Sequence, residues 1–307
     1  MLNTITIKKA VRPFDQAIQV PGDKSISHRA VMLASLAKGR SRISGFLPGE
    51  DNLSTIEAFR AMGITIDGPG ADGVVTVNGL GLDGLKEPSG DIDCGNSGTT
   101  VRLLSGILAG QDFAVTLKGD SSLSSRPMKR VTKPLEEMGA RFTFLGEEGK
   151  LPYTISGGKL KGIDYKSPVA SAQIKSSVLL AGLFAEGETT VTEPLKSRDH
   201  TERMLILFGV DVSVDGVSVG VRGGAELQAT EVEVPGDISS AAFFMVAAAL
   251  KKDSLLTIKD VGINPTRIGI IDILKKMGAD VTFNDQRGAS EPVADIVIKG
   301  GALKGVD

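Results

Sequence analysis

A repeated unit along the chain constrains its fold more than any other feature of the sequence. A helical segment that ends in glycine and precedes a short strand recurs four times, at Gly63, Gly139, Gly209 and Gly278. These glycines lie 76, 70 and 69 residues apart, and each follows a predicted helix where a left-handed backbone is favoured. The residues after them, such as 64–66 and 210–212, alternate between apolar and polar as half-buried strands do. The pattern predicts an α/β protein built from repeated units.

A second repeat, of longer range, divides the chain into domains. The sequence Val-Pro-Gly-Asp occurs at 20–23 and again at 234–237, and an alanine-rich apolar segment follows each copy. The separation of 214 residues is close to three units. We therefore expect a complete three-unit domain at residues 21–235 and a partial second domain made of 1–20 and 236–307. Within a unit the predicted order is helix, strand, helix, strand, strand.

Charge balance and apolar segments limit the class of protein. The 307 residues include 35 Lys and Arg against 37 Asp and Glu, without the basic excess of a nucleic-acid-binding domain or a polybasic membrane surface. The single Cys94 allows no intrachain disulfide and supplies no zinc site. The longest apolar run, 241–250, is too short for a membrane span and predicts a buried helix. With no signal peptide evident, we expect a soluble cytoplasmic protein.

The strongest local motif is the stretch 21–29, at the start of a predicted helix. Lys24 and Ser25 lie at the helix N-terminus, where unpaired amides favour an anion, and Arg29 follows about one turn later on the same face. These groups could converge on a phosphate or a carboxylate. An ordinary capped helix with solvated charges explains the same spacing equally well.

Later units repeat this arrangement of polar groups at helix starts. They occur at Gly95 and Gly98, at Arg126, at 171–175 and at 198–202. If the helix N-termini of three units face one cleft, they form a site for an anionic substrate. Four other residues are predicted to be structural, namely Cys94, His28, His200 and the helix cap Asp237. Asp51 or Ser54 is predicted to cap the helix near 53–62.

Together these motifs resemble the 5-enolpyruvylshikimate-3-phosphate synthase family, and the motifs at 171–175, 198–202 and 264–267 resemble its class II bacterial branch. The residues that carry the resemblance are Gly22-Asp23-Lys24-Ser25, Asn96-Ser97-Gly98-Thr99, Arg126-Pro127-Met128, Ser171-Ala172-Gln173-Ile174-Lys175, Arg198-Asp199-His200-Thr201-Glu202 and Asn264-Pro265-Thr266-Arg267. The resemblance implies the two-domain enolpyruvyl transferase fold, an inside-out α/β barrel of repeated βαβαββ units, with the second domain incomplete here. It also implies transfer of the enolpyruvyl group of phosphoenolpyruvate to the 5-hydroxyl of shikimate 3-phosphate, in aromatic amino acid biosynthesis.

The resemblance assigns expected roles residue by residue. Lys24 is expected to be catalytic and to contact both substrates. The expected ligands of shikimate 3-phosphate are Lys24, Ser25, Arg29, Ser171, Ala172, Gln173 and Arg198. Those of phosphoenolpyruvate are Lys24, Gly98, Arg126 and Gln173. No metal or organic cofactor is implied, glyphosate is the implied inhibitor, and the full-length protein is expected to be a monomer.

One part of the family pattern has no counterpart in the sequence. The acidic base of the family lies in an Asp-Glu-x-Pro stretch, and the chain ends at Asp307 just before it. We therefore expect these 307 residues to be inactive, as a C-terminally truncated form that only binds shikimate 3-phosphate. The nearest alternative enzyme is UDP-N-acetylglucosamine enolpyruvyl transferase. It would have Lys-Asn in place of Lys24-Ser25 and a loop cysteine in Pro-Gly-Gly-Cys, and neither is present.

Overall fold

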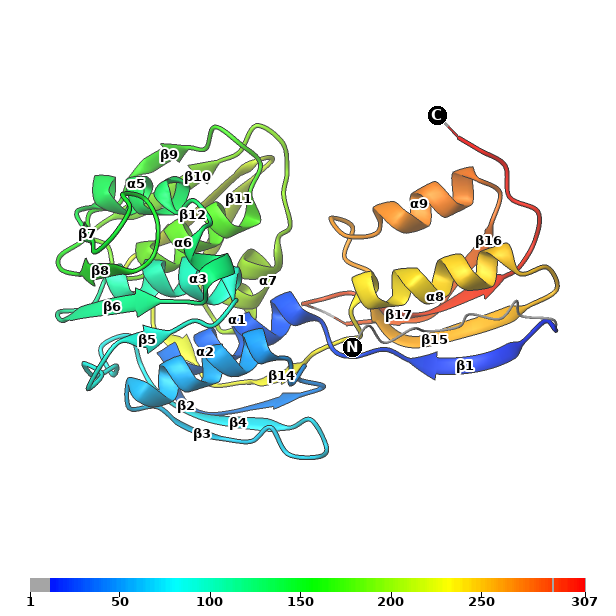
Figure 1. The fold of residues 1–307 in the computed structure, drawn as a ribbon, viewed down its shortest axis with the longest axis horizontal. Coiled ribbons are helices and arrows are strands. Elements are labelled where there is room, and N and C mark those ends of the chain that lie inside the picture. The colour runs from blue at the N-terminus through cyan, green and yellow to red at the C-terminus, as the bar shows by residue number, and fades with distance from the viewer. Residues whose placement is uncertain (1–11, 289, 307) are drawn as a thin grey trace. The chain divides into compact units, whose positions relative to one another are not determined.

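The computed structural model describes residues 12–288 and 290–306, which form two compact units (Figure 1). One unit runs from Gly22 to Val234. The other joins the segment that ends at Pro21 to the segment that starts at Pro235. The predicted location of residues 1–11 in the second domain lies outside the described residues.

Four sheets share one topology, which confirms the predicted repeated βαβαββ units. In each sheet the first strand is parallel to the second, the second is antiparallel to the next, and that strand is antiparallel to the last. The larger unit has β13(Leu227–Gln228)-β2(Ala37–Ser44)-β4(Val75–Leu80)-β3(Thr65–Asp67), β5(Ile92–Asp93)-β6(Ala114–Lys118)-β8(Tyr153–Ser156)-β7(Arg141–Phe144) and β9(Asp164–Lys166)-β10(Glu188–Thr192)-β12(Ser218–Arg222)-β11(Val212–Asp215). The smaller unit has β1(Asp15–Gln19)-β15(Leu255–Gly262)-β17(Val293–Lys299)-β16(Asp280–Arg287).

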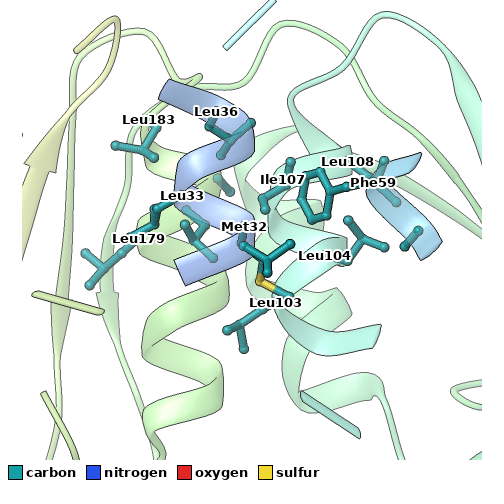
Figure 2. Packing of buried hydrophobic residues seen from close by; sticks show 14 of the residues in the cluster. Met32, Leu33, Leu36, Phe59, Leu103, Leu104, Ile107, Leu108, Leu179 and Leu183 are labelled. Carbon is teal, nitrogen blue, oxygen red and sulfur yellow. The ribbon is translucent and has the colours of Figure 1, made fainter. Parts of the chain in front are cut away.

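The core of the larger unit lies among three apolar helices, α1(Lys24–Leu36), α3(Gly98–Ala109) and α6(Ala172–Gly182). Figure 2 shows their leucines packed against one another, with residue numbers rising toward the same end in all three helices. The three helices therefore run parallel, and their N-termini lie at one end of the unit. The remaining helices of this unit are α2(Glu50–Ala61), α4(Ser121–Ser124), α5(Lys129–Met138) and α7(His200–Leu207).

The backbones of α3 and α6 approach each other closely at Gly106. A Cβ atom built on Gly106 would lie 2.1 Å from the backbone oxygen of Ser177 on α6. No side chain fits in this space, so glycine sets the separation of the two helices. The two helices carry several predicted site residues at their N-termini, so their separation also bears on the site.

At each crossing of the chain between the units, the strands before the crossing belong to a different unit from the helix after it. β1 directly precedes α1 in the sequence, yet it pairs with β15 in the smaller unit. Conversely, β13 and β14(Glu231–Glu233) precede α8(Ile238–Leu250) but pair with β2 in the larger unit. The duplicated Val-Pro-Gly-Asp motif stands at both crossings. As predicted, Asp237 caps its helix, accepting a hydrogen bond from the Ser239 amide at 2.8 Å.

The glycines of the repeat adopt the predicted backbone conformation. All four have positive φ angles at the C-terminal end of a helix, namely 88° at Gly63, 114° at Gly139, 85° at Gly209 and 94° at Gly278. A side chain with a Cβ would strain the backbone at these positions. The repeat seen in the sequence is therefore a repeat of helix endings.

The prediction that 241–250 forms a buried helix is wrong in part. The helix α8 packs Ala241 and Met245 against its sheet, but Phe243 is 79% exposed and Leu250 is 66% exposed. Within its unit the sheet covers only one face of α8, and an apolar run does not reveal which faces will be covered. Neither α8 nor any other helix in the described residues is long and apolar enough to cross a membrane.

We expect the two faces of α8 to respond very differently to substitution. Met245→Ala removes a fully buried side chain and should lower the free energy of unfolding by about 2–5 kcal/mol. Phe243→Ser alters a mostly exposed side chain and should change it by about 0.5 kcal/mol or less. Urea denaturation of both variants beside the unaltered chain measures the difference. Equal losses would contradict the burial of Met245 and the exposure of Phe243.

Candidate functional site

The candidate site lies at the shared N-terminal end of α1, α3 and α6. A side chain caps each helix: Asp23 accepts from the Ile26 amide at 3.0 Å, Ser97 from Thr100 at 3.1 Å and Ser171 from Ile174 at 3.5 Å. Five predicted site residues occupy the first or second helical position, namely Lys24, Ser25, Gly98, Ala172 and Gln173. Three helix dipoles therefore direct their positive ends to this region, which favours an anion.

Ser25, Arg29 and Arg198 are brought together at the start of α1. The guanidinium of Arg198 donates to Ser25 Oγ at 3.4 Å. The Arg29 side chain, only 5% exposed, donates from Nη1 to the backbone oxygen of Ser25 at 3.0 Å. It also donates to Thr201 Oγ1 and Ser176 Oγ, both at 2.7 Å. Arg29 is thus held rigidly, whereas Arg198 is exposed.

Lys24 is held by the neighbouring helix α2. Its ammonium forms an ion pair with the Asp51 carboxylate, and its backbone oxygen accepts from Asn52 Nδ2 at 3.0 Å. The prediction that Asp51 or Ser54 caps α2 is wrong, because the helix begins at Glu50 after Gly49, which has no side chain to cap it. Asp51 serves instead as the counter-ion of a predicted catalytic residue.

Gly98 and Arg126 meet at the start of α3. A Cβ atom built on Gly98 would lie 3.2 Å from Arg126 Nη1 and 2.9 Å from Arg102 Nη1. Arg126 Nη2 donates to Asn96 Oδ1 at 2.6 Å and to Ser122 Oγ at 3.3 Å. Two guanidinium groups therefore lie beside a position that has no side chain.

Arg102 was missed in the sequence analysis. Its side chain is 5% exposed, and Nη1 donates to Gln173 Oε1 at 2.7 Å and to the backbone oxygen of Gly98 at 3.4 Å. Burial, together with the nearby charges of Arg130 and Arg126, lowers the Arg102 pKa to about 10. Two features of the sequence could have identified Arg102 as a site residue. It is the lone charged residue in an otherwise apolar helix, and it follows Gly98 by four residues, as Arg29 follows Ser25.

A buried chain of hydrogen bonds joins the helices beneath the site. His28 Nδ1 and Thr100 Oγ1 each lie 2.7 Å from Thr55 Oγ1, and Thr100 Oγ1 also lies 2.7 Å from Ser97 Oγ. Burial, with the charges of Arg29 and Lys24, lowers the His28 pKa to about 3. His28 is therefore neutral near pH 7 and joins α1 to α2 through Thr55.

Cys94 is buried beside Asp93. Burial and the nearby Asp93 carboxylate raise the pKa of its thiol to about 12, which disfavours the reactive thiolate. Among the described residues, no cluster of three or more His, Cys, Asp or Glu side chains could hold a metal ion.

The predicted residues thus fall into two groups. One contains Ser25, Arg29 and Arg198, joined by the hydrogen bonds above. The other contains Gly98, Arg126 and Gln173, joined through Arg102. Lys24 is connected to α3, the helix that begins at Gly98 of the second group. The backbone oxygen of its ion-pair partner Asp51 accepts a hydrogen bond from Thr100 Oγ1, in the first turn of α3, at 3.3 Å. Ser171 and Ala172 lie at the start of α6 beside Gln173.

Known proteins resemble this chain along nearly its whole length. The family model described as EPSP synthase (3-phosphoshikimate 1-carboxyvinyltransferase) matches residues 8–307. A protein named 3-phosphoshikimate 1-carboxyvinyltransferase from Hydrogenovibrio crunogenus is 58% identical over 296 residues, which are 94% of this chain and 66% of that protein. One of the same name from Bacillus cereus is 55% identical over 303 residues, 98% of this chain and 70% of its own.

A solved structure has the same fold. The structure of EPSP synthase from Acinetobacter baumannii matches with a TM-score of 0.90 and 54% sequence identity, covering 96% of this chain and 66% of that one. The chain therefore spans about two thirds of the length of the relatives that it matches.

Proposed function

Because the chain belongs to the EPSP synthase family, we propose that its protein transfers the enolpyruvyl group of phosphoenolpyruvate to the 5-hydroxyl of shikimate 3-phosphate and releases phosphate. The observation that carries the proposal is the convergence of three helix N-termini, with Lys24, Arg29, Arg102, Arg126 and Arg198 among them. Both substrates are anions that would repel each other in water. Fixed cations that hold the two side by side lower the barrier to their reaction.

Shikimate 3-phosphate binds, in this proposal, to the group formed by Ser25, Arg29 and Arg198. Guanidinium groups suit its phosphate and carboxylate, because they donate paired hydrogen bonds. The bonds of Arg29 to Thr201 and Ser176 fix its orientation in advance, which reduces the ordering required on binding. The start of α6, residues 171–173, would add hydroxyl, amide and helix-dipole contacts.

Phosphoenolpyruvate binds, in this proposal, to the group around Gly98. The missing side chain of Gly98 lets the first amides of α3 approach the ligand, and Arg126 supplies a guanidinium. Buried Arg102 would orient Gln173, with which it shares a hydrogen bond of 2.7 Å. Lys24 would contact both substrates, with Asp51 holding its ammonium in place.

Four further properties are proposed with this activity. The two compact units would be the two domains of the family's fold. Glyphosate would compete for the cations that bind phosphoenolpyruvate, because it is an anion of similar size. The protein would act in the cytoplasm, and the full-length form would be a monomer.

Titration calorimetry tests the proposal and its division of the two ligands between two groups of residues. The unaltered chain should bind shikimate 3-phosphate and show no binding of UDP-N-acetylglucosamine, the substrate of the alternative enzyme. Arg198→Ala should weaken shikimate 3-phosphate binding by roughly 10–150-fold, the cost of a charge-assisted hydrogen bond. Arg126→Ala should affect phosphoenolpyruvate instead. Equal losses for both ligands in both variants would contradict the division, and absent binding of shikimate 3-phosphate to the unaltered chain would contradict the function.

A further inference from the structure

A buried ammonium lies one turn inside α6, behind the proposed shikimate 3-phosphate site. Lys175 Nζ is 2.8 Å from Glu193 Oε2 and 2.8 Å from Glu202 Oε1. The three side chains are 2%, 1% and 5% exposed. Removing such charges from water costs free energy, and their attraction often only offsets this cost. Stability alone therefore gives little reason for this arrangement.

The contacts of Glu193 lead to the proposed ligand-binding segments. Its Oε1 accepts from the Ser171 amide at 2.8 Å, and Ser171 caps α6. Its Oε2 accepts from the Ser197 hydroxyl at 2.8 Å and from the Ser197 amide at 3.3 Å. Ser197 directly precedes Arg198, whose guanidinium reaches Ser25. A single carboxylate thus ties together two site segments that come from different loops.

Glu202, the second partner of Lys175, belongs to the first turn of α7. Its neighbour Thr201 accepts the hydrogen bond from Arg29 Nε at 2.7 Å and lies 2.6 Å from Ser176 Oγ. Lys175 is therefore connected through its partner Glu193 to Ser171 and to the segment that holds Arg198. Through its other partner, Glu202, it is connected to Thr201, which holds Arg29. Burial alone would raise the pKa of Glu193, but hydrogen bonds from Lys175 and Ser197, the Lys175 charge and the Ser171 amide outweigh it and lower that pKa.

We propose that Lys175 and Glu193 are positioning residues of the shikimate 3-phosphate site, holding Ser171 and the 197–198 segment in binding geometry. This inference rests on the function proposed above. Neither residue needs to touch the ligand, because each acts through groups that do. The site is therefore sensitive to a charge pair buried behind it.

Calorimetric titration of three variants with shikimate 3-phosphate tests the inference. Glu193→Gln keeps the shape but removes the charge, and Lys175→Met keeps the length but removes the ammonium. We expect each to raise the Kd at least tenfold. The control is Tyr153→Phe, which removes a buried hydroxyl 2.9 Å from Ser105 Oγ and should lower the Tm while changing the Kd less than twofold.

The pH dependence of binding separates positioning from a general loss of stability. Glu193 faces Lys175 and Glu202, and Lys196, Asp199 and Arg203 line the same cavity of about 260 Å³. Without the Lys175 ammonium, burial and Glu202 should raise the Glu193 pKa, so that Glu193 takes up a proton as the pH falls. The ratio of Kd in Lys175→Met to Kd in the unaltered chain should then grow from pH 8 to pH 5.5. The ligand's own ionisation cancels in this ratio.

The outcomes distinguish the two proposals. If the unaltered chain binds and both variants bind within twofold of it, the positioning role is overturned and the proposed function stands. A loss as large in Tyr153→Phe, or a ratio independent of pH, also overturns it. If the unaltered chain does not bind, the proposed function fails and the positioning role with it. Should Lys175→Met not fold, Glu193→Gln and Ser197→Ala decide, with losses of about tenfold and threefold expected.

Discussion

Replacing Arg29 with alanine is expected to weaken shikimate 3-phosphate binding by about a hundredfold or more, since charge-assisted hydrogen bonds contribute about 1.5–3 kcal/mol each. The guanidinium simultaneously donates to the Ser25 backbone, Thr201 and Ser176. Its loss therefore removes a cation and also loosens Ser25, to which Arg198 is bonded. Calorimetry gives the Kd, and thermal unfolding gives the accompanying loss of stability.

One further variant separates the geometry of Arg29 from its charge, and a second serves as a control. Arg29→Lys keeps the charge but cannot make three fixed bonds from a planar group, so most of the loss should remain. Arg222→Ala, at an exposed arginine of β12, should leave the Kd within twofold. Binding by Arg29→Ala within threefold of the unaltered chain would mean that Arg29 does not serve this ligand.

Gly106→Ala is expected to destabilise the larger unit by about 3 kcal/mol, the upper part of the range for overpacked cores. Alanine normally stabilises a helix relative to glycine by about 1 kcal/mol, so the sign should reverse here. The added Cβ would lie 2.1 Å from the Ser177 backbone oxygen, and a backbone atom cannot rotate away as a side chain can. The helices α3 and α6 must then separate along their shared core.

The matched control is another helical glycine with open surroundings. Gly269 begins α9(Gly269–Lys276) and is exposed, and a Cβ atom added to it would meet nothing within 4 Å. Gly269→Ala should change the free energy of unfolding by about 0.5 kcal/mol or less. Urea denaturation of the two variants measures the contrast. A neutral Gly106→Ala would show that α3 and α6 do not pack as closely as described.

Local rules predicted the parts of the fold that depend on neighbouring residues. The repeat glycines and the Asp237 cap follow from helix endings and starts, which a few consecutive residues determine. The exposure of Phe243 could not be predicted in this way, because it depends on which elements cover α8. Burial is a property of the assembled fold.

The candidate site shows the same limit. Lys24, Ser25 and Arg29 were predicted from spacing on one helix, and they do lie at one helix start. Arg102 was missed because its partner Gln173 is 71 residues away in the sequence. The sequence pattern predicts Asp51 as a cap, because a pattern cannot show that Lys24, 27 residues earlier, pairs with its carboxylate. Side-chain contacts between different helices can be identified only from the structure.

The pairing of β1 with a strand far along the sequence has a consequence for how the chain folds during synthesis. Asp15 of β1 pairs with Leu255 of β15, and Arg42 of β2 pairs with Glu231 of β14. At a translation rate of about 5–20 residues per second, β1 is made on the order of tens of seconds before its partner. The larger unit, continuous from Gly22 to Val234, can fold before β15, the partner strand of β1, has been made. Among the described strands, β1 is therefore the earliest made and one of the last to pair, and until then its backbone groups stay open to pairing with other chains.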